Sequence, residues 1–441
     1  MKKVLFFVAI FLAFSCVSYS NSELYQGKLK NGLVYRIYES SQLPIISINI
    51  KIKAGSYFDK KFGESSVLSN CLESCSKKNL DAERFREMVD MAGGKISVSS
   101  SKEYIDIDAK FPLSKAEKAF CLLSEMFKSD FDDKKNFQFS KREPYDYLKS
   151  LQNDKDYLAI HAAFVNLIKQ QAYSHTSLGS FEGLKSIKND DVREFFLKHI
   201  GANNAVLSVS GGIKDKKQIE KLIKRYFSSL RKSDKSIYEP VKFFDKSHVE
   251  NIVKHTNQSY VYMAFRSFSD KDKRHYAAKI LAFILGGNLN SILAKDVRTK
   301  HGYAYSVFAF NYGLTNGGMF VVGFQTQNKF TLKALNLVFE DIKNIDKFIT
   351  KKRVDDAKRY LIGKNSISMQ SSISVAHALS YGYMLGDKVL PWEQFRKNID
   401  MVTKDDVINV ANSIFNHVSV GIVSEKNYKN EIKKLIDKYG Y

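Results

Sequence analysis

The amino-acid sequence predicts an α+β fold of two homologous sandwich domains, each a mostly antiparallel sheet with helices on one face, arising by internal duplication. Three observations support this class: segments that recur at a near-constant offset, the same order of elements in both halves, and a length of 441 residues. A chain this long exceeds what one hydrophobic core usually serves, and it suits two domains.

Two helical segments recur at nearly the same offset. NDDVREFF at 189–196 returns as KDDVINVA at 404–411, which is an offset of 215. IEKLIKRY at 219–226 returns as IKKLIDKY at 432–439, which is an offset of 213. Agreement of this kind is hard to obtain by chance, and it indicates a duplicated chain.

The other predicted elements follow one order in both halves. Each half opens with a strand, ISINIKIKAG from Ile46 or SYVYMAFRSF from Ser259, and continues through helical stretches to a strand pair and an amphipathic helix. The matched segments are KISVSSS and YIDIDAKF with YAYSVFAF and GMFVVGFQ, helix 114–127 with helix 331–342, and the apolar strands 204–211 and 417–424.

A polar junction divides the halves. Residues 231–250 are polar, carry Pro240 and are interpreted as the linker. This places an N-terminal domain at 21–230 and a C-terminal domain at 251–441. The helical region from Lys141 to Gln171 is expected to pack between the two domains.

Residues 1–20 are interpreted as a secretory signal peptide. Two lysines precede an apolar run from Val4 to Phe14, and Ser18 and Ser20 are spaced for cleavage. Eleven apolar residues are too few to span a bilayer. The mature protein is therefore expected in the periplasm or cell envelope without a membrane span, and lipidation of Cys16 is the disfavoured alternative.

The formal net charge of the chain is +22. Such a charge could serve a membrane surface, nucleic acid or acidic peptides. Lys and Arg are nevertheless spread along the chain among acids, and export argues against nucleic acid. A solvated, lysine-rich surface is the favoured interpretation.

Three cysteines remain after signal removal. Cys71 and Cys75 lie four positions apart on a predicted helix and therefore share a face, and Cys121 follows later. No His or fourth Cys stands at zinc-finger spacing. Buried small hydrophobes, or one disulfide to Cys121, are the favoured alternatives.

Several segments resemble recurring segments of the pitrilysin/insulinase superfamily of inverzincin metallopeptidases, and within it the short two-domain bacterial and mitochondrial-processing-peptidase-like proteins. These segments are IKAGSYFDKKFGESSVL, MAGGKISVSSSKEYIDIDAKFP, LGGNLNSILAKDVRTKHGYAYSV and SISVAHALSYGYMLG. The resemblance implies that active members carry His-x-x-Glu-His on an early helix, with zinc on the two histidines and the Glu as base. A further Glu about 77 residues later completes such a site.

This chain departs from that zinc motif at every position. Aligned on Gly63, the motif falls on Ser66, Val67, Leu68, Ser69 and Asn70, and the later glutamate falls on Tyr147. No His occurs from Met1 to Ile160, so no shift of the alignment restores the pair. Serine hydroxyls and amides are poor zinc ligands, and no base is left to activate water. The resemblance therefore implies no metal and no peptidase activity for this chain alone.

The second half keeps a pair of hydrogen-bond donors. Arg298 precedes Tyr305 by seven positions, with Gly302 between them. The resemblance implies that an Arg and a Tyr at this spacing bind the substrate carbonyl and the developing oxyanion, each donor contributing about 3 kcal/mol. The structural alternative is an Arg that offsets a helix dipole and a Tyr that packs. Gly286-Gly287 resembles the family's glycine-bearing loop near the substrate path, or marks a turn.

Other candidate residues fit no chemistry as well. His161, His175 and His301 are isolated from partners at metal or triad spacing and are interpreted as surface or packed histidines. Ser174 and Ser306 lack an oriented base, which disfavours a serine hydrolase.

The leading hypothesis is a non-catalytic subunit of a heterodimeric zinc metallopeptidase. It would supply Arg298 and Tyr305 in trans to bind a peptide substrate, with zinc on a homologous partner subunit, because the resemblance implies that two-domain chains pair and divide the labour. The alternative is a catalytically inactive peptide-binding or scaffold protein of the cell envelope.

Overall fold

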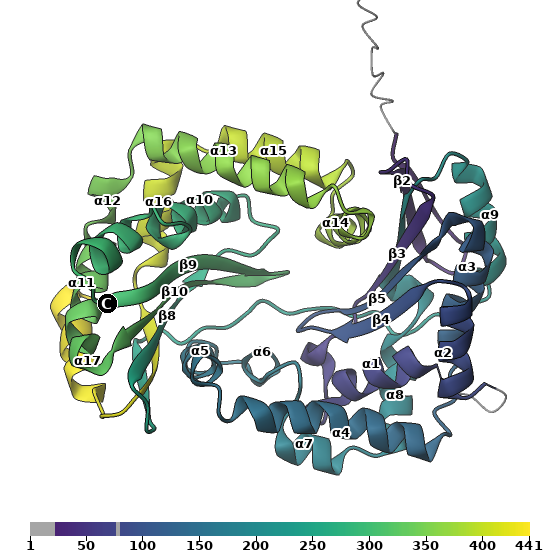
Figure 1. The fold of residues 1–441 in the computed structure, drawn as a ribbon, viewed down its shortest axis with the longest axis horizontal. Coiled ribbons are helices and arrows are strands. Elements are labelled where there is room, and N and C mark those ends of the chain that lie inside the picture. Colours follow the sequence, from purple (N-terminus) through teal and green to yellow (C-terminus); the bar gives the residue numbers. More distant parts are fainter. Residues whose placement is uncertain (1–22, 76–79) are drawn as a thin grey trace, which may run out of the picture.

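The computed structural model describes residues 23–75 and 80–441, which form two sheets with helices packed around them (Figure 1). The first sheet has the strand order β1-β2-β6-β3-β5-β4, and the second has the order β7-β11-β8-β10-β9. Without β1, the two orders are equivalent strand for strand. In both sheets the first two strands of that shared order form the parallel pair, β2 with β6 and β7 with β11, and the other pairs are antiparallel.

The strands have the following bounds. In the first half they are β1 (Tyr25–Lys28), β2 (Val34–Glu39), β3 (Ile45–Ile52), β4 (Lys95–Ser100), β5 (Ile105–Pro112) and β6 (Ala205–Gly211). In the second half they are β7 (His248–Val253), β8 (Gln258–Ser267), β9 (Ala304–Leu314), β10 (Gly317–Gln327) and β11 (Val418–Ser424).

The helices repeat less regularly than the strands. In the first half they are α1 (Glu64–Ser74), α2 (Ala82–Met91), α3 (Ala116–Met126), α4 (Lys134–Leu151), α5 (Lys155–Val165), α6 (Gln171–Ser174), α7 (Phe181–Ser186), α8 (Asn189–His199) and α9 (Lys216–Phe227). In the second half they are α10 (Arg274–Gly286), α11 (Thr331–Lys343), α12 (Ile345–Phe348), α13 (Lys351–Ser368), α14 (Ser372–Leu385), α15 (Pro391–Met401), α16 (Lys404–Ile414) and α17 (Lys429–Tyr439).

The predicted fold class is confirmed, because two equivalent, mostly antiparallel sheets carry helices from their own half on one face. The strands expected from the repeats are all present. Three strands were not predicted, namely β1, β2 and β7, and β7 begins at His248 inside the expected linker. The boundaries at 230 and 250 stay predictions. No helix among the described residues is long and apolar enough to cross a membrane.

Each sheet has a second face that is covered by a helix from the other half. Helix α14 packs on β6 and β3 of the first sheet, and α5 packs on β11 and β8 of the second. Figure 1 shows α14 beside the first sheet and α5 below the second. The expected interdomain packing of residues 141–171 is therefore confirmed for α5, whereas α4 packs on α1 within its own half.

The two covered faces differ in chemistry. Under α14 the first sheet places polar side chains, and Ser47, Asn49 and Lys51 alternate with the buried isoleucines of β3. Lys51 forms an ion pair of 2.5 Å with Asp106, and its ammonium lies 5.0 Å from the ring centroid of Tyr104. The α14 helix adds His377, whose Nε2 is 2.8 Å from Asp108.

Under α5 the second sheet is mainly apolar, apart from Tyr262 and Gln325, which donate hydrogen bonds to Asp156 of α5. Tyr262, Ala264 and Val321 form one buried cluster with Ala159 of α5. A Cβ built on Gly421 of β11 would lie 2.0 Å from the carbonyl oxygen of Ala159, so the helix backbone rests directly on the strand. The halves are thus joined by one polar contact and one close-packed apolar contact.

Two equivalent hairpin turns also meet between the halves. Glu103, in the turn between β4 and β5, is buried and accepts hydrogen bonds from the backbone N–H and hydroxyl of Thr315, in the turn between β9 and β10, at 2.9 and 2.7 Å. The hydroxyl of Tyr173 donates to the same carboxylate at 3.0 Å. Burial raises the pKa of Glu103, and these donors oppose that shift.

The three cysteines in the described part of the chain, Cys71, Cys75 and Cys121, form no disulfide with one another. The predicted alternative of a disulfide to Cys121 is wrong, because Cys71 and Cys75 are buried in the first core while Cys121 lies on α3. The other alternative, small buried hydrophobes, describes Cys71 and Cys75.

Candidate functional site

The helix that would carry a zinc motif is α1, and it is built as a structural element. Gly63 caps its N-terminus with φ of 119°, and the carboxylate of Asp59 accepts hydrogen bonds from the N–H groups of Gly63 and Ser65 at 2.7 and 2.9 Å. Ser66 and Ser69 are buried. This is N-terminal capping that satisfies free helix donors.

One of the motif positions of α1, Asn70, bonds to the neighbouring helix α4, and Ser74 further along α1 does the same. The Asn70 amide donates to the carbonyl of Ser140 on α4 at 3.1 Å, and Asn136 donates to Ser74 at 2.7 Å. Tyr147, the position of the later glutamate, is 57% exposed. These contacts pack α4 on α1 and offer no group that would bind a metal.

The remaining acidic and thiol groups of α1 do not replace the lost ligands. Glu64 is buried, which raises its pKa, and it accepts the Lys60 backbone N–H at 2.8 Å. Burial raises the pKa of the Cys71 thiol to about 12, so it is not a thiolate at neutral pH. Within the described chain, no three His, Cys, Asp or Glu residues are placed to hold a metal ion.

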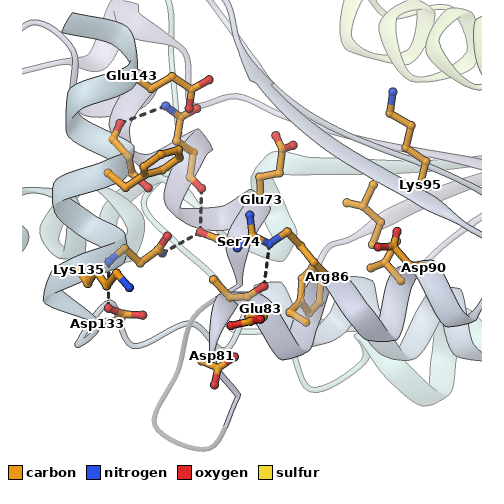
Figure 2. A pocket seen from close by; sticks show the side chains of 18 of the residues that line it. Glu73, Ser74, Asp81, Glu83, Arg86, Asp90, Lys95, Asp133, Lys135 and Glu143 are labelled. Atoms are coloured by element: carbon orange, nitrogen blue, oxygen red, sulfur yellow. Dashed lines mark hydrogen bonds between the residues drawn. The ribbon is translucent and has the colours of Figure 1, made fainter. Parts of the chain in front are cut away.

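A cavity of about 660 Å³ lies beside the C-terminal half of α1, between α2, α4 and the start of β4 (Figure 2). Acidic side chains outnumber basic ones in its lining: Glu73, Asp81, Glu83, Asp90, Asp133 and Glu143 against Arg86, Lys95 and Lys135. Glu73 is already engaged, because it accepts the backbone N–H of Val98 on the outer edge of β4 at 3.0 Å. No histidine or cysteine lines this cavity, so it does not rebuild a metal centre.

The structure brings the predicted pair, Arg298 and Tyr305, together. The guanidinium carbon of Arg298 lies 5.3 Å from the centroid of the Tyr305 ring. Both side chains are exposed, and Tyr305 is 79% exposed. Over residues 23–75 and 80–441, neither side chain has a hydrogen bond or ion pair of its own.

Two irregular elements position this pair. Arg298 lies in a π-helical turn from Ala294 to Lys300, and a left-handed Gly302 with φ of 63° ends it. Tyr305 is the extra residue of a β-bulge, because Gln325 pairs with Ser306 and Thr326 pairs with Ala304. Single π-turns occur often at functional sites, and bulges re-aim a side chain.

Buried neighbours hold both elements in place. Val297 is fully buried in the second core, its carbonyl accepts the Tyr303 N–H at 2.9 Å, and Ala304 is also buried. Arg298 and Tyr305 therefore project from a fixed backbone. Chemically, a guanidinium and a phenol on one exposed face can donate hydrogen bonds to one oxygen atom.

The glycine pair before this segment has a packing role. Gly286 ends α10, and a Cβ there would lie 2.4 Å from the backbone nitrogen of Ala309 on β9. Only glycine allows the helix end to approach the strand so closely. The pair thus marks a close contact, and its resemblance to a substrate loop stays a prediction.

The three singled-out histidines lie apart. His161 stacks on Tyr157 at 5.5 Å, and His301 has Nδ1 3.0 Å from the carbonyl oxygen of Asp296. His175 stacks on Phe62 at 4.0 Å, with Nε2 4.0 Å from Asp59. The approach of His175 to Asp59 was not foreseen, because 116 positions separate them in sequence.

Sequence comparison places the chain among peptidase-like proteins. The family model "Peptidase M16 inactive domain" matches residues 186–361, which include the Arg298–Tyr305 segment. An "Uncharacterized zinc protease" of Rickettsia felis is 25% identical over 408 residues, which cover 91% of this chain and 97% of the relative. The "Non-peptidase homolog YmxG" of Helicobacter pylori is 26% identical over 441 residues, with 97% and 99% covered.

Structure comparison agrees at the level of the fold. A peptidase M16 inactive domain from Pseudomonas fluorescens superposes with a TM-score of 0.83 at 21% identity, covering 92% of this chain and 98% of that chain. The two-sheet arrangement is therefore shared along nearly the full length of both proteins.

Proposed function

We propose that this chain is the non-catalytic subunit of a heterodimeric zinc metallopeptidase. Its match to the peptidase M16 inactive domain over residues 186–361, and its similarity to the zinc protease and non-peptidase relatives, support this proposal. In this proposal, Arg298 and Tyr305 bind a peptide substrate in an active site whose zinc is held by a homologous partner subunit. The complex works in the periplasm or cell envelope.

One observation carries the proposal: Arg298 and Tyr305 are neighbours, exposed and without polar partners in the described chain, and they are held by a π-turn and a bulge. Irregular backbone of this kind is costly to keep where side chains merely cover a surface. A pure packing role for Tyr305 is disfavoured, because 79% of the residue is exposed.

The absence of zinc ligands on α1 supports action in trans. The residues of α1 do not fit zinc, since Ser66 is buried and Asn70 is bonded to α4. A donor pair aimed at an oxyanion has no reaction to assist unless another group activates the attacking water. Zinc chemistry is therefore assigned to a partner, and this chain contributes binding and orientation of the substrate.

The expected role of each donor follows from its chemistry. The guanidinium of Arg298 presents several N–H groups in a plane and can hold the carbonyl oxygen of the scissile peptide. The Tyr305 hydroxyl can donate a further hydrogen bond as negative charge develops on that oxygen. Removing one such donor typically costs about 3 kcal/mol, which is about 100-fold in rate.

The test uses the reconstituted two-chain complex. R298A and Y305F are each expected to lower kcat about 100-fold, while the zinc content of the complex stays unchanged. Y305F keeps the ring that Arg298 contacts, so it isolates the hydroxyl. The control K295A removes another exposed cation of the same π-turn and should leave the rate unchanged. Unaltered turnover in both R298A and Y305F contradicts the role.

A peptide-binding or scaffold protein without a catalytic partner is the second candidate, favoured by the similarity to the Helicobacter pylori non-peptidase homolog. In that case R298A weakens binding of an extended peptide to the isolated chain, and addition of a zinc-bearing chain produces no hydrolysis.

A further inference from the structure

Asp341 of α11 is a buried carboxyl group with an unpaired oxygen. It lies near the end of the helix, and only 5% of the residue is exposed. Its Oδ2 atom is enclosed and has no hydrogen-bond partner among the described residues. Buried polar atoms are nearly always paired, and an unpaired one costs folding free energy. An aspartate at such a position therefore calls for a reason other than packing.

The surroundings of Asp341 lead to the π-turn that carries Arg298. Helix α11 packs against this turn, and also against β10 and α17. The charged groups that act on Asp341 are Asp296, Lys300 and His301, at the turn, and Glu340 of its own helix. The buried carboxyl thus lies beneath the segment that positions one member of the donor pair.

The turn itself is closed around Asp296. The backbone carbonyl of Asp296 accepts the N–H of His301 at 3.2 Å and lies 3.0 Å from Nδ1 of the same histidine. The Asp296 carboxylate lies 3.2 Å from the Lys300 ammonium and 3.5 Å from His301 Nδ1. The carbonyl of Arg298 accepts the Gly302 N–H at 3.1 Å. A disturbance at Asp296 therefore reaches the backbone that presents Arg298.

The other elements on α11 bring little charge to Asp341. Strand β10 contains no charged residue, and the short turn Asn328–Phe330 joins the opposite end of the helix. From α17, the Lys438 ammonium donates to Asn336 at 3.0 Å, which is five positions before Asp341. The electrostatic balance at Asp341 is therefore set by the π-turn and by Glu340.

This environment favours the protonated form of Asp341. Burial, and after it the charges of Asp296 and Glu340, raise the pKa of Asp341 to about 7, and Lys300 and His301 oppose the shift. Because an aspartate in an unfolded chain has a pKa near 3.9, the closed turn holds this proton more tightly than an opened one. The stability of the closed turn therefore falls as the pH rises from about 4 to about 7, and it levels off above that.

We propose that Asp341 is a positioning residue that makes the Arg298 turn sensitive to pH. The protonated carboxyl supports the closed turn, and the ionised carboxylate, buried and facing Asp296, loosens it. For peptide binding this inference rests on the proposed function, because Arg298 is the group that the turn presents. The pH response of the turn itself can be measured without a partner subunit or a peptide.

The experiment measures amide hydrogen exchange of the purified chain, with each rate divided by that of an unstructured peptide of the same sequence. The probes are the backbone N–H groups of His301, Gly302 and Tyr303, which close the turn. Their protection in the wild type should fall about tenfold between about pH 6 and about pH 8, because the closed turn releases its extra proton over this range. D341N keeps the shape of the side chain but cannot ionise, so its protection should stay constant.

Two further variants control this result. D346N removes an exposed acid of the following helix α12 and should keep the wild-type change. D296N should move the change to lower pH, because the facing carboxylate no longer raises the pKa of Asp341. Equal protection of the wild type at both pH values, or the wild-type change retained in D341N, overturns the proposal.

Turnover of the two-chain complex separates this inference from the proposed function. With an internally quenched fluorogenic peptide as the probe, the ratio of KM at the higher pH to KM at the lower pH should be smaller in D341N than in the wild type. Equal ratios, together with a loss of turnover in R298A, contradict the pH response and leave the proposed function standing. The expected exchange pattern, together with unaltered turnover in R298A, supports the pH response and contradicts the proposed function.

Discussion

The two halves share one fold and differ in the chemistry placed on it. In the first half, α1 has buried serines and a bonded asparagine at the zinc-ligand positions, and the face under α14 is polar. In the second half, Arg298 and Tyr305 project from irregular backbone, and the face under α5 is mainly apolar. The difference shows that a duplicated sheet order can be kept while each copy takes a separate role.

The largest loss of folding stability is expected from breaking the polar contact under α14. K51M removes the cation of a nearly buried ion pair and leaves Asp106 without it, which should lower the free energy of unfolding by about 4 kcal/mol. The double variant K51M/D106N removes both charges and should recover most of that loss. Urea denaturation measures both, and a K51M loss below about 1 kcal/mol would contradict a strongly stabilising buried ion pair between β3 and β5.

The apolar contact under α5 is tested by filling it. G421V places a side chain where the backbone of Ala159 and Ala163 already lies, so α5 must move off β11. We expect a loss of about 3 kcal/mol in thermal or urea denaturation. G363A, at an exposed glycine of α13 with nothing within 4 Å of a Cβ, should instead stabilise by about 0.5 kcal/mol. Similar changes in stability for G421V and G363A would contradict the close contact between α5 and β11.

The smallest expected change in folding stability concerns β1, a strand that has no counterpart in the second sheet. Hydrogen bonding from Tyr35, then from Lys224 and Tyr25, lowers the pKa of Glu220 to about 2. Because the unfolded value is about 4.3, this contribution is present above that pH and is lost as the pH falls toward about 2. E220Q should therefore lose less stability than the wild type over this range.

The size of this pH effect is about 1 kcal/mol or less, since Glu220 lies close to solvent. The equivalent residue of the second half is Lys433, and K433Q should keep the wild-type pH dependence of unfolding. Parallel plots of unfolding free energy against pH for E220Q and the wild type would contradict the lowered pKa of Glu220.

Much of the fold could be predicted because hydrophobic alternation and repeated segments can be recognised directly in the sequence. The isoleucines of β3 identify the face toward its own helices, but alternation does not say what covers the opposite face. Ser47, Asn49 and Lys51 are buried because α14 arrives from more than 300 positions away. Helix α14 has no single apolar stripe, so its sequence does not indicate which surface it covers.

The candidate site was predicted only in part. The spacing of Arg298 and Tyr305 drew attention through family resemblance, and the loss of zinc ligands followed from the absence of histidine. The bulge at Tyr305 was not foreseen, because it depends on how β10 pairs with β9. The π-turn likewise depends on Val297 reaching the core and on Gly302 ending the turn.

The most direct test of the central claim is the mass and metal content of the native complex, captured through a tag on this chain from its own cell envelope. We expect a one-to-one pair with a homologous chain of similar length, one zinc ion per pair, and peptide hydrolysis that needs both chains. Recovery of the chain alone, or with unrelated partners and no zinc, would contradict it.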